Sequence, residues 1–134
     1  MNGYLLDANI ITALIKRELK IIDKIERLPT NDMPIFISVI TYYEIERGLI
    51  AVNATRKLEI FNNFLDKYQI LFLDDLNIAK KASQIYANLK RRGCLIQDAD
   101  ILIAATAIIH NLILVSNDSD LLRVEELILE NWLV

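Results

Sequence analysis

The stretch DADILIAATAIIHNLILVSND, residues 98–118, decides the fold. Its first part, residues 98–110, has apolar side chains at helical spacing and two acids in the first turn, where carboxylates are favoured. Residues 112–115 then form a short apolar run, which predicts a buried β-strand, and Asp118 follows it closely. A helix that leads directly into a buried strand is the repeating unit of α/β proteins.

The same alternation extends along the rest of the chain. Further buried strands are predicted at residues 4–6, 35–38 and 70–73, with Pro29 and Pro34 bracketing the loop before the second, and residues 127–129 add an edge strand. Helices are predicted at residues 10–28 with a break near 17–20, and at 39–52, 54–68, 76–92 and 98–110. Because helices separate the strands, right-handed crossovers make the sheet mostly parallel, with four to five strands that are buried on both faces. We therefore expect a single α/β domain over residues 1–134.

The composition excludes several classes of protein. The chain has 134 residues, 54% of them hydrophobic, which suffices for one domain that buries about two thirds of its unfolded surface. Its formal net charge of -3 argues against a general nucleic-acid coat protein, so nucleic-acid binding must be local. The single cysteine, Cys94, excludes an intramolecular disulfide, and no uncharged segment reaches the ~20 residues of a membrane span. Together with an N-terminus that lacks a signal sequence, these features indicate a cytoplasmic protein without membrane contact.

Common catalytic motifs are missing from the sequence. His110 is the only histidine and lies at a predicted helix C-terminus, where the helix dipole stabilises a partly charged imidazole. Cys94 has no CxxC partner and no neighbouring histidine, which argues against a thiol nucleophile or a zinc site. The three glycines form neither a GxGxxG nor a GxxxxGK[ST] loop, so nucleotide cofactors are not indicated.

Four acids lie where a strand ends or a helix begins. Asp7 and Asp118 follow predicted strands, Asp100 lies in the first turn of a helix, and Glu44 lies about one and a half turns into the helix after residues 35–38. The carboxyl ends of parallel strands meet at one edge of the sheet, so these acids should converge there. Like charges about 4 Å apart repel by about 4 kcal/mol at an effective dielectric of about 20. A hard divalent cation such as Mg²⁺ or Mn²⁺ would remove that conflict.

Each acid also has an ordinary structural interpretation. Asp7 and Asp118 have the position of N-caps, and Asp98 or Asp100 could simply satisfy the start of its helix. Glu44 could share a polar helix face with Arg47. The argument for a site therefore depends on the joint placement of the acids at one edge.

Five segments resemble the PIN-domain ribonucleases of the VapC toxin type: YLLDANII, SVITYYEIERGL, DADILIAATA, LILVSNDSDL and, near the end, LILENW. They occur in the family's order and span nearly the whole chain. In that family the first segment more commonly reads DTN, whereas this sequence has DAN, with Ala8 in place of the threonine. The difference removes a hydroxyl but no metal ligand. The resemblance implies a PIN-like three-layer α/β/α fold around a central sheet. It also assigns the family's acidic set to Asp7, Glu44, Asp100 and Asp118, with Asn9 and Ser116 as polar supports, and leaves Asp98 and Asp120 without an assigned role.

The resemblance implies an activity and partners as well. PIN-type nucleases are thought to hold one or two Mg²⁺ or Mn²⁺ ions on these acids and to attack an RNA phosphodiester with a metal-activated water. Asp7, Glu44 and Asp100 would be the main ligands, and Asp118 a ligand or an orienting group. Toxins of this type are held inactive by a cognate antitoxin protein and commonly form homodimers.

Local positive charge and an apolar surface are available for these partners. Arg47 lies three residues after Glu44 on the same predicted helix face and is our first candidate for a phosphate contact. The other candidate cations are Lys16, Arg17, Lys80, Lys81, Lys90, Arg91 and Arg92. The N-terminal helices carry many apolar side chains, which form either the core or a groove for a partner: Ile10, Ile11, Leu14, Ile15, Ile21, Ile22 and Ile25.

Two other functions share an acid after the first strand. A phosphatase of the haloacid dehalogenase type requires a second Asp two residues later, where this chain has Asn9. A phosphoacceptor signalling module normally has an acidic pair at the first strand end and a lysine after a late strand, and neither is visible. Both alternatives are weaker than a metal-dependent endoribonuclease.

Overall fold

The computed structural model describes residues 1–28 and 33–134. Of the loop expected between Pro29 and Pro34, residues 29–32 lie outside the described residues. The described residues form five short strands, six α-helices and one 3₁₀ helix, in the alternating order expected from the sequence. No helix in this part of the chain is both long enough and apolar enough to cross a bilayer.

The strands form one parallel sheet, in the order β3-β2-β1-β4-β5. Their bounds are β1 (Tyr4–Leu6), β2 (Ile35–Ser38), β3 (Gln69–Leu71), β4 (Ile113–Val115) and β5 (Leu129–Glu130). In the centre, Tyr4 pairs with Ile35 of β2 on one side and with Ile113 of β4 on the other. Every neighbouring pair is parallel, so all carboxyl ends open on the same edge. The expected mostly parallel sheet of four to five strands is confirmed.

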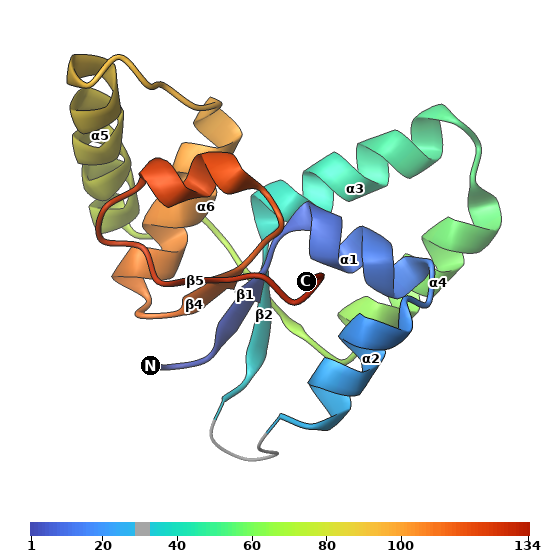
Figure 1. Ribbon diagram of the computed structural model, residues 1–134. Coiled ribbons are helices and arrows are strands. Elements are labelled where there is room, and N and C mark those ends of the chain that lie inside the picture. The colour runs from blue at the N-terminus through green and yellow to red at the C-terminus, as the bar shows by residue number, and fades with distance from the viewer. Residues whose placement is uncertain (29–32) are drawn as a thin grey trace.

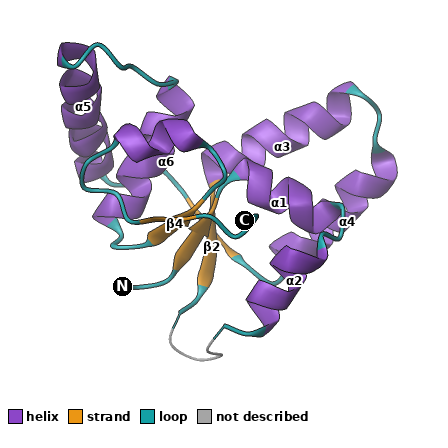
Figure 2. Ribbon diagram, in the orientation of Figure 1, coloured by secondary structure: helices purple, strands orange, loops and turns teal. Residues whose placement is uncertain are grey.

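The helices cover both faces of the sheet, which confirms the three-layer architecture (Figures 1 and 2). Their bounds are α1 (Ala8–Ile15), α2 (Leu19–Glu26), α3 (Val39–Ala51), α4 (Thr55–Leu65), α5 (Leu76–Arg91), α6 (Asp98–Ile109) and the 3₁₀ helix η1 (Ser119–Arg123). Helices α1 to α4 pack on one face, where Tyr4 and Leu6 of β1 point, and α5 and α6 pack on the other, against Leu5. The alternation within β1 follows from the two-residue period of a strand.

Burial of the strands depends on their place in the sheet. All residues of β1 and β4 are buried, as expected for strands that helices cover on both sides. The expectation is wrong for β3, where Gln69 is exposed, because β3 forms the edge of the sheet. This strand also ends at Leu71, before the apolar Phe72 and Leu73, which are both exposed. The apolar run in the sequence therefore predicted a strand that continues too far.

The first long helical pattern is two helices, as the expected break near residues 17–20 indicated. Helix α1 begins earlier than expected, at Ala8, and ends with Lys16 as its C-cap. Arg17 then adopts a left-handed conformation with φ of 60°, and the Glu18 N–H donates to Ala13 O at 2.9 Å. This turn sends α2 away from the axis of α1, so the two helices form a hairpin over the sheet.

Capping residues set several of the other boundaries. Ser38 ends β2 and caps α3, because its hydroxyl accepts a hydrogen bond from Ile40 N at 3.1 Å. Asp75 caps α5 in the same way, through Asn77 N at 2.8 Å. After α5, Gly93 has a φ of 69°, a conformation that glycine adopts without strain. The ends of α3, α5 and α6 therefore lie within one residue of the predicted ends, whereas α4 stops at Leu65, three residues early.

Candidate active site

Asp7 lies at the carboxyl end of the central strand and is the most buried acid of the site, with 5% of its surface exposed. Its two oxygens have different partners. Oδ1 accepts from Ala8 N at 2.8 Å and caps α1, whereas Oδ2 accepts from the Ser116 hydroxyl at 2.7 Å. The capping interpretation is therefore correct for one oxygen only. The second oxygen is held toward the loop after β4.

A hydrogen-bond network joins the loop after β1 to the loop after β4. Asn9 Nδ2 donates to Ser116 Oγ at 3.1 Å and lies 3.5 Å from Asp7 Oδ2. In the other direction, Asn117 N donates to Asn9 Oδ1 at 2.9 Å, and Asp118 N donates to Ser116 Oγ at 3.0 Å. The predicted polar supports Asn9 and Ser116 thus contact each other across 107 residues of sequence. Each has both donor and acceptor groups engaged, so the two loops hold each other in place.

Asp118 combines a cap with a position in the acidic cluster. Its Oδ1 accepts from Asp120 N at 2.9 Å at the start of η1, which confirms the capping interpretation for that oxygen. Its charge also helps to raise the pKa of Asp7, although burial is the larger cause and the hydrogen bonds from Ser116 and Ala8 oppose the rise. Asp120 itself pairs with Arg123 at 3.2 Å.

Glu44 and Asp100 lie close enough to the other acids for their charges to act on them. Burial raises the pKa of Glu44, the charge of Asp7 raises it further, and Arg47 lowers it. The pKa of Asp100 rises to about 6, first through burial and then through the charges of Asp7, Asp118, Glu44 and Asp120. Acids from four separate segments therefore share one electrostatic environment.

The structure separates the two acids at the start of α6. Asp100 responds to the charges of the cluster, whereas Asp98 lines a hollow between α5 and α6 with Ser83, Tyr86 and Leu102. Two residues along a helix differ by about 200° in direction, so the two acids leave opposite sides of α6.

The chemistry of the donor set fits a hard divalent cation. All the donors are carboxylate oxygens, and the charges of neighbouring acids help to raise the pKa of Asp7, Glu44 and Asp100 in the absence of a cation. Within residues 1–28 and 33–134, however, no three acidic, histidine or cysteine side chains stand close enough to enclose an ion as placed. The fold brings the acids to one edge, and a cation would have to draw the side chains together.

Arg47 is the predicted cation whose charge acts on an acid of the cluster. It lowers the pKa of Glu44, and it lies over the ring of Tyr43 at 4.9 Å from the ring centre, with Nη1 3.4 Å from the Tyr43 hydroxyl. Tyr43 is 59% exposed. Arg47 is therefore held beside Glu44 by a neighbour on its own helix while it remains open to solvent.

The other predicted cations divide between two regions. Lys16 lines a hollow of about 240 Å³ between α1 and α3, together with Glu44 and Lys57, a cation that the sequence analysis did not select. By contrast, Lys81 of α5 pairs with Glu126 at 3.0 Å, and Arg92, the C-cap of α5, pairs with Glu125 at 3.7 Å. These two cations connect α5 and its cap to the segment that precedes β5.

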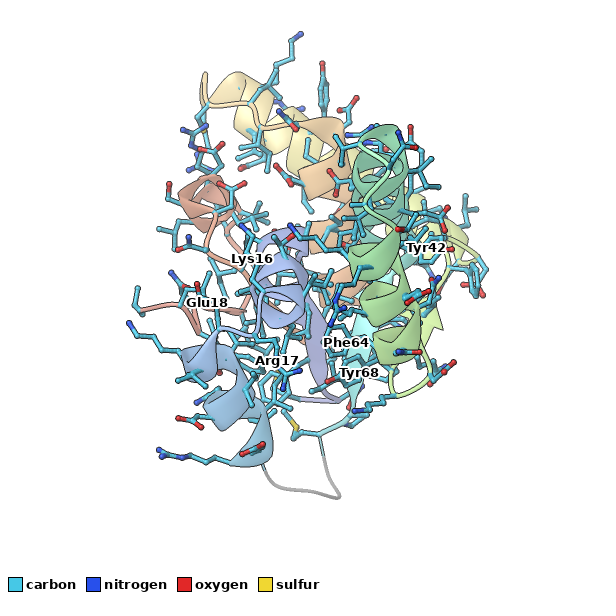
Figure 3. All side chains as sticks on the ribbon, turned by 90° about the vertical axis from the view of Figure 1, so that its right-hand side faces the viewer. Lys16, Arg17, Glu18, Tyr42, Phe64 and Tyr68 are labelled. Carbon is cyan, nitrogen blue, oxygen red and sulfur yellow. The ribbon has the colours of Figure 1, made fainter. Side chains whose placement is uncertain are left out.

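The apolar surface of the N-terminal helices is mostly core. Five of its seven aliphatic residues are buried: Ile10, Ile11, Leu14, Ile15 and Ile21. Ile22 and Ile25 are partly exposed, and Ile22 lines a hollow of about 390 Å³ with Leu14, Phe64 and the basic residues Arg17 and Lys67. Figure 3 shows Arg17, at the turn between α1 and α2, near Phe64 of α4.

Comparisons with known proteins agree with this architecture. The PIN domain family model matches residues 4–127. Ribonuclease VapC2 of Haemophilus influenzae is 34% identical, with 98% of this chain and 99% of the relative covered, and Ribonuclease VapC2 of Rickettsia felis is 33% identical, with 96% and 97% covered. Ribonuclease VapC1 of Methanocaldococcus jannaschii is 41% identical over 75 residues, which are 56% of this chain and 52% of that protein.

Solved structures show the same fold. VapBC2 from Rickettsia felis, bound to a DNA fragment from its promoter, contains a chain that matches with a TM-score of 0.84 and 30% identity, with 96% of this chain and 98% of that chain covered. A chain of VapBC-1 from nontypeable Haemophilus influenzae matches with a TM-score of 0.86 and 25% identity, with 98% of each chain covered. The chain described here therefore belongs to the PIN-domain family and, within it, to the VapC ribonucleases.

Proposed function

We propose that this protein is a Mg²⁺- or Mn²⁺-dependent endoribonuclease that acts as the toxin of a toxin–antitoxin pair. The observation that carries the proposal is the shared electrostatic environment of Asp7, Glu44, Asp100 and Asp118 at the carboxyl edge of a PIN-type sheet. The family match supports the reaction class, and a similar activity is named for the relatives. It also extends over most of residues 1–134, in keeping with a single PIN domain.

The four acids would have different roles in binding the cation. Asp7, Glu44 and Asp100 would hold the cation, and Asp118, whose Oδ1 already caps η1, would bind it or orient its neighbours. Bound there, the ion would supply a nucleophile at neutral pH and offset charge on the phosphate. Ser116 and Asn9 would keep Asp7 Oδ2 directed at the crevice, which limits the reorganisation that binding requires.

The RNA backbone would be held by cations beside the crevice. Arg47 is exposed next to Glu44, and Lys16 and Lys57 line the adjacent hollow. Since the whole chain carries a net charge of -3, this local group would supply the attraction to phosphates. Such contacts would make cleavage weaker at high salt.

The two alternative functions find no support in the site. Asn9 occupies the position where a phosphatase of the haloacid dehalogenase type needs its second Asp, and its side chain is engaged with Ser116 and with Asn117 N. The family match is also to PIN domains. Neither alternative is carried further.

A cognate antitoxin is the proposed protein partner, because the matched structures contain VapBC complexes. The hollow between the α1–α2 turn and α4 suits an apolar segment, since Leu14, Ile22 and Phe64 line it. Arg17 and Lys67 at its rim would favour acidic residues on that segment. We also propose that the protein forms a homodimer.

Substitution of Asp7 by Asn tests the catalytic proposal. The change preserves size and removes the charge, so we expect cleavage of single-stranded RNA to fall by at least ~100-fold, while circular dichroism shows a folded protein. Chelation with EDTA should stop cleavage by the unmodified protein, and Mg²⁺ or Mn²⁺ should restore it. Asp66→Asn, at the exposed end of α4, is the matched control. Full metal-dependent activity in Asp7→Asn would contradict the assignment.

A further inference from the structure

The C-terminal segment is attached to the loop that carries Ser116 and Asn117. Strand β5 brings Glu130 O within 2.9 Å of Ser116 N, which extends the pairing of β4 and β5 by one bond. Directly after it, Asn131 Nδ2 donates to Asn117 Oδ1 at 2.8 Å. The other end of the same amide is also occupied, because Asn131 Oδ1 accepts from Leu133 N at 3.0 Å. With both ends used, the Asn131 amide has a single orientation that satisfies its contacts.

The contact continues from Asn117 to the central acid. Asn117 N donates to Asn9 Oδ1 at 2.9 Å, Asn9 Nδ2 donates to Ser116 Oγ at 3.1 Å, and Ser116 Oγ donates to Asp7 Oδ2 at 2.7 Å. The Asn9 amide and the Ser116 hydroxyl each accept one of these bonds and donate the next, whereas Asn117 joins the network through two groups, its side-chain oxygen and its backbone N–H. The C-terminal segment is therefore connected to the acidic site by hydrogen bonds on both sides of Asn117.

The start of this chain is held by the core. Trp132, next to Asn131, is only 6% exposed and packs edge-on against Tyr4 of the central strand, with 5.1 Å between ring centres. Its indole N–H donates to Glu130 Oε1 at 2.9 Å, so it also fixes the end of β5. The contacts of Trp132 with Tyr4 and Glu130 thus hold the segment independently of the acidic cluster, and they fix the place of Asn131.

From this arrangement we propose that Asn131 is a positioning residue for the acidic site. It holds the Asn117 side chain, which keeps the loop after β4 in the place where its backbone N–H orients Asn9 toward Ser116 and Asp7. The inference rests on the proposed function, because it assigns a task in metal binding. It also gives a role to the Asn-Trp pair of LILENW, which the acids alone leave unexplained. Outer partners of metal ligands commonly influence affinity in this way.

Mn²⁺ affinity, measured by calorimetry, tests the proposal without relying on cleavage. Asn131→Ala should weaken Mn²⁺ binding by about 3- to 10-fold. This loss is at or below the low end of what is usual for outer partners of metal ligands, because three residues stand between Asn131 and Asp7. Asn117→Ala cuts the same contact but leaves its own backbone N–H in place, so it should have the same effect. The double variant should be no weaker than either single variant. Asn62→Ala, on the exposed face of α4, is the control and should leave the affinity unchanged.

A purely structural role for Asn131 makes a different prediction. In that case Asn131→Ala would lower the melting temperature but leave Mn²⁺ affinity unchanged well below the transition, and that result would overturn the proposal. In RNA cleavage, the positioning role predicts a lower kcat with an unchanged KM, because substrate contacts are intact.

A second measurement needs no metal. Hydrogen exchange at the Asn117 amide should be at least ~10-fold faster in Asn131→Ala, since this N–H donates to Asn9 Oδ1 only while the loop is held. Exchange at the Leu114 amide, which donates to Ile128 O within the sheet, should not change. Unchanged exchange at Asn117 would overturn the positioning role. If the unmodified protein binds no Mn²⁺, the proposed function fails instead, and the exchange result alone decides whether Asn131 holds the loop.

Discussion

Asp100 illustrates how the fold changes the chemistry of a single side chain. In sequence it is one of two acids in the first turn of α6, where either could serve as an ordinary helix-start carboxylate. In the structure its pKa rises to about 6, because it is partly buried and faces four other acids. Its charged form is therefore disfavoured by folding in the absence of a cation. That cost is characteristic of a binding site rather than of a stabilising cap.

Substitution of Asp100 by Asn should stabilise the metal-free protein at neutral pH. The pKa in the folded state lies above the reference value of 3.8, so the folded protein binds the extra proton, and stability falls as the pH rises between about 4 and 6. For a fully buried group the rise would be worth ~3 kcal/mol. Solvent screening of this partly exposed side chain reduces the expected gain to about 1 kcal/mol.

Urea unfolding in the presence of EDTA measures this effect. The gain of Asp100→Asn over the unmodified protein should be present at pH 7.5 and should largely disappear at pH 4, where the carboxyl of the folded protein is protonated. A variant that is less stable than the unmodified protein at both values would show that Asp100 acts mainly as a helix-start residue.

Helix α3 connects local sequence signals to the site. It begins directly after β2 because Ser38 ends the strand and caps the helix, and it carries Glu44 and Arg47 over the carboxyl edge. Glu44 needs this short connection: a longer loop would move the acid by a turn or more relative to Asp7. The cap is therefore part of what places the acid, although it makes no contact with the cluster.

Removal of the Ser38 hydroxyl should weaken this helix start. Ser38 is fully buried and its hydroxyl accepts from Ile40 N, so Ser38→Ala should cost about 1 to 2 kcal/mol of unfolding free energy. Ser83→Ala removes a hydroxyl that donates to Ala79 O on the exposed side of α5, and it should change stability by less than about 0.5 kcal/mol. Equal effects of the two substitutions in urea unfolding would argue against a capping role for Ser38.

The molecule as a whole separates the acidic edge of the sheet from the hollow that we propose as the partner surface. The carboxyl edge of the parallel sheet gathers the acids, whereas the hollow between the α1–α2 turn and α4 is lined by apolar side chains and by the basic Arg17 and Lys67. The residues of the α1–α2 hairpin contribute to both, since Lys16 lines the hollow beside Glu44 and Arg17 lines the one beside Phe64. A partner that binds the hairpin would therefore lie close to the acidic site.

Mass measurement by size-exclusion chromatography with light scattering tests the proposed assembly. We expect a homodimer for the protein alone and a larger complex after co-expression with its antitoxin. Ile22→Lys should weaken that complex, because it places a charge on the apolar wall of the hollow. Leu122→Lys, at an exposed position on η1, should leave it intact. A complex that tolerates Ile22→Lys would exclude this hollow as the antitoxin site.

The sequence by itself determined the order of strands and helices, most of their boundaries and the parallel sheet, because periodicity, caps and strand-end acids are local signals. It also selected the acids that the fold brings together. Only the tertiary structure decided that Asp98 lines a separate hollow between α5 and α6, that β3 is an exposed edge and that Asn131 contacts the loop of Asn117. These features depend on which segments become neighbours in space, and a hydrogen bond between residues 107 positions apart, such as that of Asn9 with Ser116, leaves no periodic trace in the chain.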